Sequence, residues 1–191
     1  MNWKSITKHI LSYACNPVAL LRVKDVGRWI DIRSGLMVHG PHHIHIGNHV
    51  RIGRNARLSS YSGGGIFVED GCSLGQHFSA IAGGDIRIKK NVLMASYISI
   101  VSENHGVDPE AGKSYGDQPL IKRDVEIGAC CWLGEKVMIL PGVTIGDWCV
   151  IGACSLVNKD IPPYTIAVGN PRRIIKKYNF VTHQWVKFND N

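Results

Sequence analysis

Aliphatic residues recur every six positions along most of this chain, and this period constrains the fold more than any other feature of the sequence. The series is Ile46, Ile52, Leu58, Val68, Leu74, Ile88, Met94, Ile100, Ile127, Leu133, Ile139, Ile145, Ile151 and Val157. A period of six fits neither one face of an α-helix nor unbroken strand alternation. It predicts short strands, each followed by a turn, in a repeating architecture.

The residues around each aliphatic position predict how the strands close into a coil. A second small or apolar residue stands two positions earlier, as at Val50 and Cys131, so both side chains point to one side of a strand. Glycine often follows, as at Gly53, where we expect the backbone to turn. Three such strands close a triangular coil, and successive coils stack like neighbouring strands of a sheet. The blocks 44–61, 66–83, 86–103, 125–142 and 143–160 predict about five coils.

This pattern divides the chain into three parts and predicts an all-β fold. Residues 30–160 form the parallel coil, residues 1–29 an N-terminal cap, and residues 161–191 a C-terminal cap. Pro162, Pro163 and the alternation from Phe180 to Phe188 predict a closing helix and strand in this last part.

Composition narrows the possible environments and partners. The chain has 191 residues and a formal charge of +7, which fits one domain that attracts anions such as phosphate groups. Its six cysteines form no CxxC pair, so we expect reduced thiols in a cytoplasmic protein. No apolar run approaches the roughly 18 residues of a membrane span.

The period breaks between Ile100 and Val125, where a polar segment rich in glycine and proline intervenes. A loop of this length on an ordered coil usually carries function, so we expect the active site in residues 102–119. It contains Asn104-His105-Gly106, with Asp108-Pro109 just beyond.

These loop residues resemble the active-site loop of the hexapeptide-repeat O-acetyltransferases. The likeness is to the maltose and galactoside acetyltransferases, and closer still to the polysaccharide and lipopolysaccharide O-acetyltransferases. The segments Trp132–Gly146, Asn158–Pro163 and Ala167–Pro171 resemble the same family, followed by a basic run. The resemblance implies a left-handed coil, a homotrimer, acetyl-CoA as co-substrate, no metal and no nucleic acid. It implies transfer of an acetyl group to a hydroxyl of a saccharide or polysaccharide precursor.

The resemblance also implies roles for particular residues. His105 matches the family's catalytic histidine, and an imidazole suits the role of general base. Glu103 and Asp108 are the nearest candidates to orient its ring. The residues implied to contact acetyl-CoA are Trp132, Gly134, Ala153, Asn158, Lys159, Arg173 and Lys176. Those implied to contact the acceptor are His77, Asn104 and Asp108, although His77 lies where the family's sugar acetyltransferases often place an asparagine.

Three other functions stay open. An antibiotic O-acetyltransferase would use the same chemistry, although its subfamily has a different loop motif. A zinc-dependent γ-type carbonic anhydrase shares the coil, and five histidines lie close together in this sequence: His39, His42, His43, His45 and His49. A non-catalytic solenoid could bind anionic polysaccharide through its basic surface.

Overall fold

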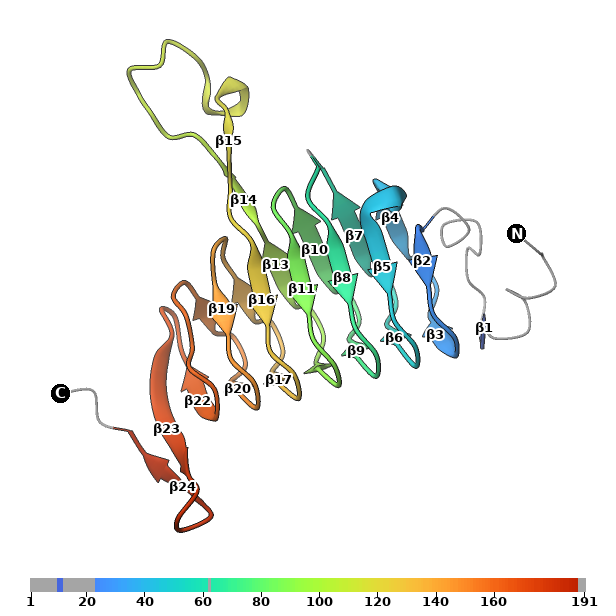
Figure 1. Cartoon of the computed structure of the whole chain (residues 1–191). Coiled ribbons are helices and arrows are strands. Elements are labelled where there is room, and N and C mark those ends of the chain that lie inside the picture. The colour runs from blue at the N-terminus through green and yellow to red at the C-terminus, as the bar shows by residue number, and fades with distance from the viewer. Residues whose placement is uncertain (1–9, 12–22, 62, 189–191) are drawn as a thin grey trace.

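The computed structural model describes residues 10–11, 23–61 and 63–188, and it consists of short strands wound into one coil (Figure 1). Three parallel sheets run along the coil, one for each side of a triangular cross-section. The fold is the predicted left-handed parallel β-helix. Among the described residues, no helix is long and apolar enough to cross a bilayer.

Each side of the coil is a ladder of strands contributed by successive turns. The first side contains β2 (Asp25–Val26), β5 (Ile44–Ile46), β8 (Ile66–Val68), β11 (Ile86–Ile88), β16 (Val125–Ile127) and β19 (Thr144–Ile145). The second contains β1 (Ile10–Leu11), β3 (Ile30–Ile32), β6 (Arg51–Ile52), β9 (Ser73–Leu74), β12 (Leu93–Met94), β17 (Trp132–Leu133), β20 (Val150–Ile151) and β22 (Thr165–Val168). The third contains β4 (Met37–His39), β7 (Arg57–Ser60), β10 (Ser79–Ala82), β13 (Ser99–Val101), β18 (Met138–Ile139) and β21 (Leu156–Val157).

The coil makes about seven turns, so the predicted number of five was too low. A turn from Asp25 to His39 precedes the first predicted block, and β22 continues the second side beyond residue 160. The sequence hides the early turn because Arg33 follows Ile32, at a position where most later turns have glycine.

The interior is filled by the periodic aliphatic residues, as predicted. Every member of the six-residue series is buried, and so are the residues two positions earlier, from Val50 to Cys149. Burying one such side chain stabilises the fold by roughly 1.5–3 kcal/mol. Because both residues of each pair point inward, the residue between them points outward and does not contribute to the core.

The glycines after the aliphatic residues were expected to allow the backbone to turn, but the structure gives them another role. A Cβ on Gly53 would lie 2.5 Å from the backbone nitrogen of Gln76, and one on Gly75 would lie 2.2 Å from the carbonyl oxygen of Ala95. Glycine therefore permits close stacking of one turn on the next. The left-handed backbone of the corner falls two residues later, at Asn55 and His77, each with a φ of 55°.

The C-terminal cap contains strands only, which corrects the predicted closing helix. β22 pairs antiparallel with β23 (Arg173–Asn179), which pairs antiparallel with β24 (Gln184–Lys187). The described residues contain no α-helix, only the 3-10 helices η1 (Pro41–His43) and η2 (Tyr115–Asp117). β23 extends the second sheet, and backbone pairing with β22 on one edge and β24 on the other holds it as a strand. Of the predicted N-terminal cap, residues 1–9 and 12–22 lie outside the described residues, while β1 pairs with β3.

Candidate active site

The predicted loop leaves the coil as a two-stranded ribbon between β13 and β16 (Figure 1). β14 (Glu103–His105) pairs antiparallel with β15 (Leu120–Lys122), and His105 lies opposite Leu120. Backbone pairing thus holds His105 at the end of a strand, and its side chain is exposed. The ribbon projects this histidine away from the body of the coil.

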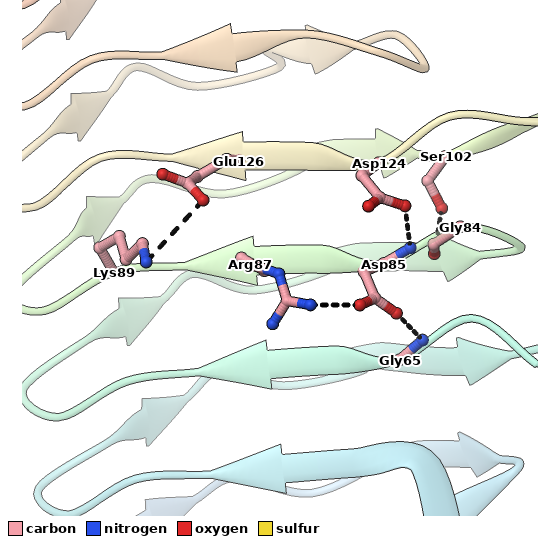
Figure 2. A network of polar contacts seen from close by, with 8 residues as sticks. All are labelled: Gly65, Gly84, Asp85, Arg87, Lys89, Ser102, Asp124 and Glu126. Carbon is pink, nitrogen blue, oxygen red and sulfur yellow. Dashed lines mark hydrogen bonds and ion pairs between the residues drawn. The ribbon is translucent and has the colours of Figure 1, made fainter.

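Polar side chains fix both ends of the ribbon to the turn below it. Ser102 is fully buried, and its hydroxyl donates to the carbonyl oxygen of Gly84 at 2.7 Å. At the other end, the Asp124 carboxylate accepts a hydrogen bond from the backbone nitrogen of Asp85 at 2.8 Å. Figure 2 shows Asp85 bonded in turn to Arg87 and to the backbone of Gly65. The ribbon is therefore tied to two successive turns of the coil.

The tip of the loop is organised around Gln118, the only buried residue among those from 103 to 124. Its side chain donates to the backbone oxygen of Asp108 at 2.8 Å and accepts from the backbone nitrogen of Asp108 at 3.0 Å. The Asp108 carboxylate accepts a hydrogen bond from the backbone of Glu110. Asp108 therefore shapes the loop, and no hydrogen bond joins it to His105 within the described part of the chain.

His105 lines a pocket of about 350 Å³ at the base of the ribbon, together with Asn104, Val107, Ile121, Arg123 and Pro141. Asn104 and His105, which are consecutive in the sequence, both line this pocket. Arg123 was not predicted, and it places a guanidinium on the wall of the same pocket. Its side chain packs against the turn at Gly142, where a Cβ would lie 3.1 Å from the Arg123 Cδ.

Glu103 lies two residues before His105 in β14, but its carboxylate is turned back onto the coil. A Cβ added to Gly83 would meet the Glu103 Oε2 at 2.0 Å, so the missing side chain at Gly83 makes room for this carboxylate. Within the described residues, no hydrogen bond joins Glu103 to the His105 ring. Neither of the two residues predicted to orient the ring is in contact with it in a single chain.

Three of the residues predicted to contact acetyl-CoA lie on the second side of the coil or at its following corner: Trp132, Gly134 and Ala153. Trp132 points outward from β17 with 53% of its surface exposed, as strand alternation predicts. Gly134 and Ala153 follow in successive turns and are in close contact, because a Cβ on Gly134 would lie 2.6 Å from the Ala153 nitrogen. Asn158 is exposed after β21.

The basic residues of the tail are arranged by an irregularity in β23. Arg173 pairs with Val168 and Lys176 pairs with Ile166, with a register shift between Ile166 and Ala167. In a regular strand, residues three positions apart point to opposite faces of the sheet. Here the bulge pairs Arg173 and Lys176 with Val168 and Ile166, which share one face, so the two cations lie on the same face. Within the described ranges, neither cation forms an ion pair.

Lys159 lies where the tail returns to the third side. The Arg172 guanidinium donates to the carbonyl oxygens of Lys159 and Asp160, the latter at 2.7 Å. Arg172 thus has a structural contact, while the Lys159 side chain is exposed.

His77, predicted to contact the acceptor, is at the corner between the second and third sides. Its ring stacks on Tyr97 with centroids 4.6 Å apart. The neighbouring Gln76, rather than His77, lines a groove of about 440 Å³ that also contains three arginines. The sequence did not indicate this groove, because its residues come from four successive turns that are 20 to 22 positions apart.

The clustered histidines are separated by the fold. His45 lies on the first side, 2.8 Å from an Asp25 oxygen, whereas His39 lies on the third side beside Ser59. His49 stacks on Trp29 at a corner. Among the residues that the structure describes, no three His, Cys, Asp or Glu side chains are grouped to hold a metal ion.

Comparisons with known proteins identify relatives over most of the chain. Residues 124–159 match the family described as "Bacterial transferase hexapeptide (six repeats)". Over 162 residues the chain is 33% identical to "Putative lipopolysaccharide biosynthesis O-acetyl transferase WbbJ" of Escherichia coli (strain K12), covering 82% of this chain and 83% of that protein.

Solved structures share the same coil. A maltose O-acetyltransferase from Clostridium difficile 630 is 30% identical with a TM-score of 0.59, covering 84% of this chain and 73% of that one. AntD, an N-acyltransferase from Bacillus cereus in complex with dTDP and 3-hydroxybutyryl-CoA, has a TM-score of 0.75 and covers 86% of this chain and 88% of that one. At 22% identity, this second likeness shows the fold alone.

Proposed function

The chain belongs to the hexapeptide-repeat acetyltransferase family, and on that premise we propose that it transfers the acetyl group of acetyl-CoA to a hydroxyl of a saccharide or polysaccharide precursor. The similarity to WbbJ over four fifths of the chain supports a saccharide acceptor. The similarity to a maltose O-acetyltransferase supports the same chemical class.

The observation that carries this proposal is His105 in its pocket on the projecting ribbon. A neutral imidazole there takes the proton of the acceptor hydroxyl while the oxygen attacks the thioester carbonyl. The carbon–sulfur bond then breaks, the acetyl group stays on the acceptor oxygen, and CoA leaves as a thiol after receiving a proton. The thioester is already activated, so no covalent enzyme intermediate is needed.

We propose that acetyl-CoA lies along the corner that Gly134 and Ala153 form, with Trp132 as a wall. Asn158 borders the same end of the coil. Lys159, Arg173 and Lys176 then face the phosphates of the nucleotide, where each charge-assisted hydrogen bond stabilises binding by about 1.5–3 kcal/mol.

We also propose that the active unit is a cyclic homotrimer. Leu93 and Trp132 are paired neighbours on the second side, and each exposes about half of its surface. Contiguous exposed apolar side chains of this kind mark interaction surfaces. A neighbouring coil packed here would cover them and supply the second wall of the cofactor slot.

The test is to offer acetyl-CoA and a panel of saccharides to the protein and to analyse the products by mass spectrometry. The proposal expects a gain of one acetyl group on a hydroxyl and a matching release of free CoA. Acetyl-CoA that stays intact with every saccharide and glycan intermediate of the panel would contradict it. Wild-type protein with its thioester replaced by free acetate serves as the control, because acetate is not activated.

A further inference from the structure

Three arginines gather at the corner between the second and third sides: Arg33 follows β3, while Arg51 and Arg54 belong to the turn of β6. We call the hollow lined by Arg33, Arg51, Arg54, Gln76 and Ser96 the arginine groove; its volume is about 440 Å³. This volume is within the range of sites that bind small molecules. The three arginines lie in the N-terminal half of the coil, while the far end of the groove, at Ser96, adjoins the turn of Gly134.

Positive charge in the arginine groove is only partly compensated. The Asp31 carboxylate pairs with Arg33 at 3.1 Å and with Arg51 at 3.6 Å, so one acid serves two cations. Arg54 forms no ion pair with any residue in the described ranges, and no carboxylate is among the lining residues. Two positive charges therefore remain in one concave surface, which attracts an oxyanion.

An aromatic pair stands beside this charge. Gln76 and Ser96 of the groove are each followed by an aromatic residue, His77 and Tyr97. These two rings stack with an interplanar angle of 4°, and Tyr97 exposes 50% of its surface. Amphipathic rings next to hydrogen-bonding groups suit a ligand with both polar and apolar faces, as a sugar ring has.

We propose that the arginine groove binds a carboxylate or phosphate group of the acceptor, so that the acceptor is an acidic saccharide. This inference rests on the proposed function. The planar guanidinium presents two parallel donors that match both oxyanions, and Arg54 can use its donors without giving up an ion pair. Gln76 and Ser96 supply further hydrogen bonds to hydroxyls.

The position of the groove favours the acceptor over the cofactor as the source of the oxyanion. Along the second side Arg51 pairs with Ser73, Ser73 with Leu93, and Leu93 with Trp132. Trp132 is therefore three strands away, roughly 14 Å along the coil. The cofactor's phosphates have their own cations at the opposite end, in the basic tail.

Calorimetry at low salt, with no acetyl transfer involved, tests the groove itself. The probes are inorganic pyrophosphate, glucose 6-phosphate, glucuronic acid and neutral glucose. We expect one saturable pyrophosphate site per chain and a roughly tenfold loss of affinity for each anionic probe in Arg54→Gln. Arg54→Lys should recover part of that loss. Arg28→Gln removes the same charge from an exposed site outside the groove and should change affinity less than twofold.

The remaining measurements separate the possible outcomes. No saturable pyrophosphate binding, or equal binding by wild type and Arg54→Gln, would overturn the site. If Arg54→Gln weakens CoA but leaves pantetheine unchanged, the groove serves the cofactor and the acceptor assignment is wrong. Groove binding that persists in a protein without acetyl transfer would refute the proposed function alone. Transfer to neutral and acidic saccharides at equal rates would refute the acidic acceptor alone.

Discussion

His105 differs from the other histidines that the structure describes because it is held by a strand that belongs to no side of the coil. Pairing with β15 fixes its backbone, and its pocket contains an amide, a guanidinium and apolar carbons. A base in this position can approach a hydroxyl that lies outside the coil, where a large saccharide has room.

Replacing His105 by alanine should lower turnover by roughly two to four orders of magnitude, because the proton of the acceptor then has no base. Affinity for CoA should change little, since the imidazole meets the acceptor. Steady-state kinetics and CoA calorimetry measure the two effects, with His183→Ala on the terminal hairpin as the matched control. Near-full turnover in His105→Ala would rule out this residue as the base.

Two buried cysteines, Cys72 and Cys131, serve the packing of the coil rather than its chemistry. Burial raises the pKa of the Cys72 thiol to about 11, so this thiol is neutral at physiological pH. A hydrogen bond with Cys149 and burial both raise the pKa of Cys131. Such thiols are poor nucleophiles, and both Cys72 and Cys131 occupy inward positions of the coil as small apolar residues do.

At the scale of elements, the six-residue period predicted most of the coil because it reports directly which residues point inward. Every aliphatic residue of the series is buried, and the polar interruption forms the ribbon that carries His105. The turn from Asp25 to His39 was not counted because glycine is absent after Ile32. The closing helix was wrong because β23 adds antiparallel to the edge that β22 offers, a long-range pairing that the local sequence does not report.

The candidate site was predictable only where a contiguous motif marks it. Residues 104–108 lie side by side in sequence, so their likeness to a family loop could be read directly. The arginine groove joins Arg33, Arg51 and Arg54 across turns of unequal length, and the bulge in β23 aligns side chains of odd spacing. The groove and the bulge both depend on the register between strands, which cannot be read from the sequence alone.

The bulge in β23 leads to a prediction for the basic tail. Arg173→Ala and Lys176→Ala should each weaken acetyl-CoA binding roughly tenfold to a hundredfold, since each loses a charge-assisted contact with phosphate. The loss should shrink for acetyl-pantetheine, which lacks the nucleotide. Lys177→Ala is the matched control because Lys177 pairs with the buried Thr165 and contacts the Phe188 ring. Calorimetry with both thioesters measures this; equal losses for the two would place the phosphates elsewhere.

At the scale of the whole molecule, the two halves of the proposed site lie on different corners of one coil. The ribbon of His105 leaves between the third and first sides, whereas the arginine groove lies between the second and third. We propose that two chains contribute to each site, one with its ribbon and one with its groove, which is the arrangement that a cyclic trimer provides.

Mixed trimers can therefore restore activity that neither parent has. His105→Ala lacks the base, and Arg51→Gln combined with Arg54→Gln lacks the oxyanion contacts, so each homotrimer should be nearly inactive toward an acidic saccharide. In trimers assembled at random from equal amounts, a site needs an intact histidine from one chain and intact arginines from its neighbour. About a quarter of the sites should then be complete, and co-expressed protein should show about a quarter of wild-type turnover.

Wild type co-expressed with His105→Ala should show about half of wild-type turnover, which controls for mixing. If one chain supplied both parts, the two variants together would show no more activity than the parents, and a stable monomer in sedimentation would exclude the arrangement altogether.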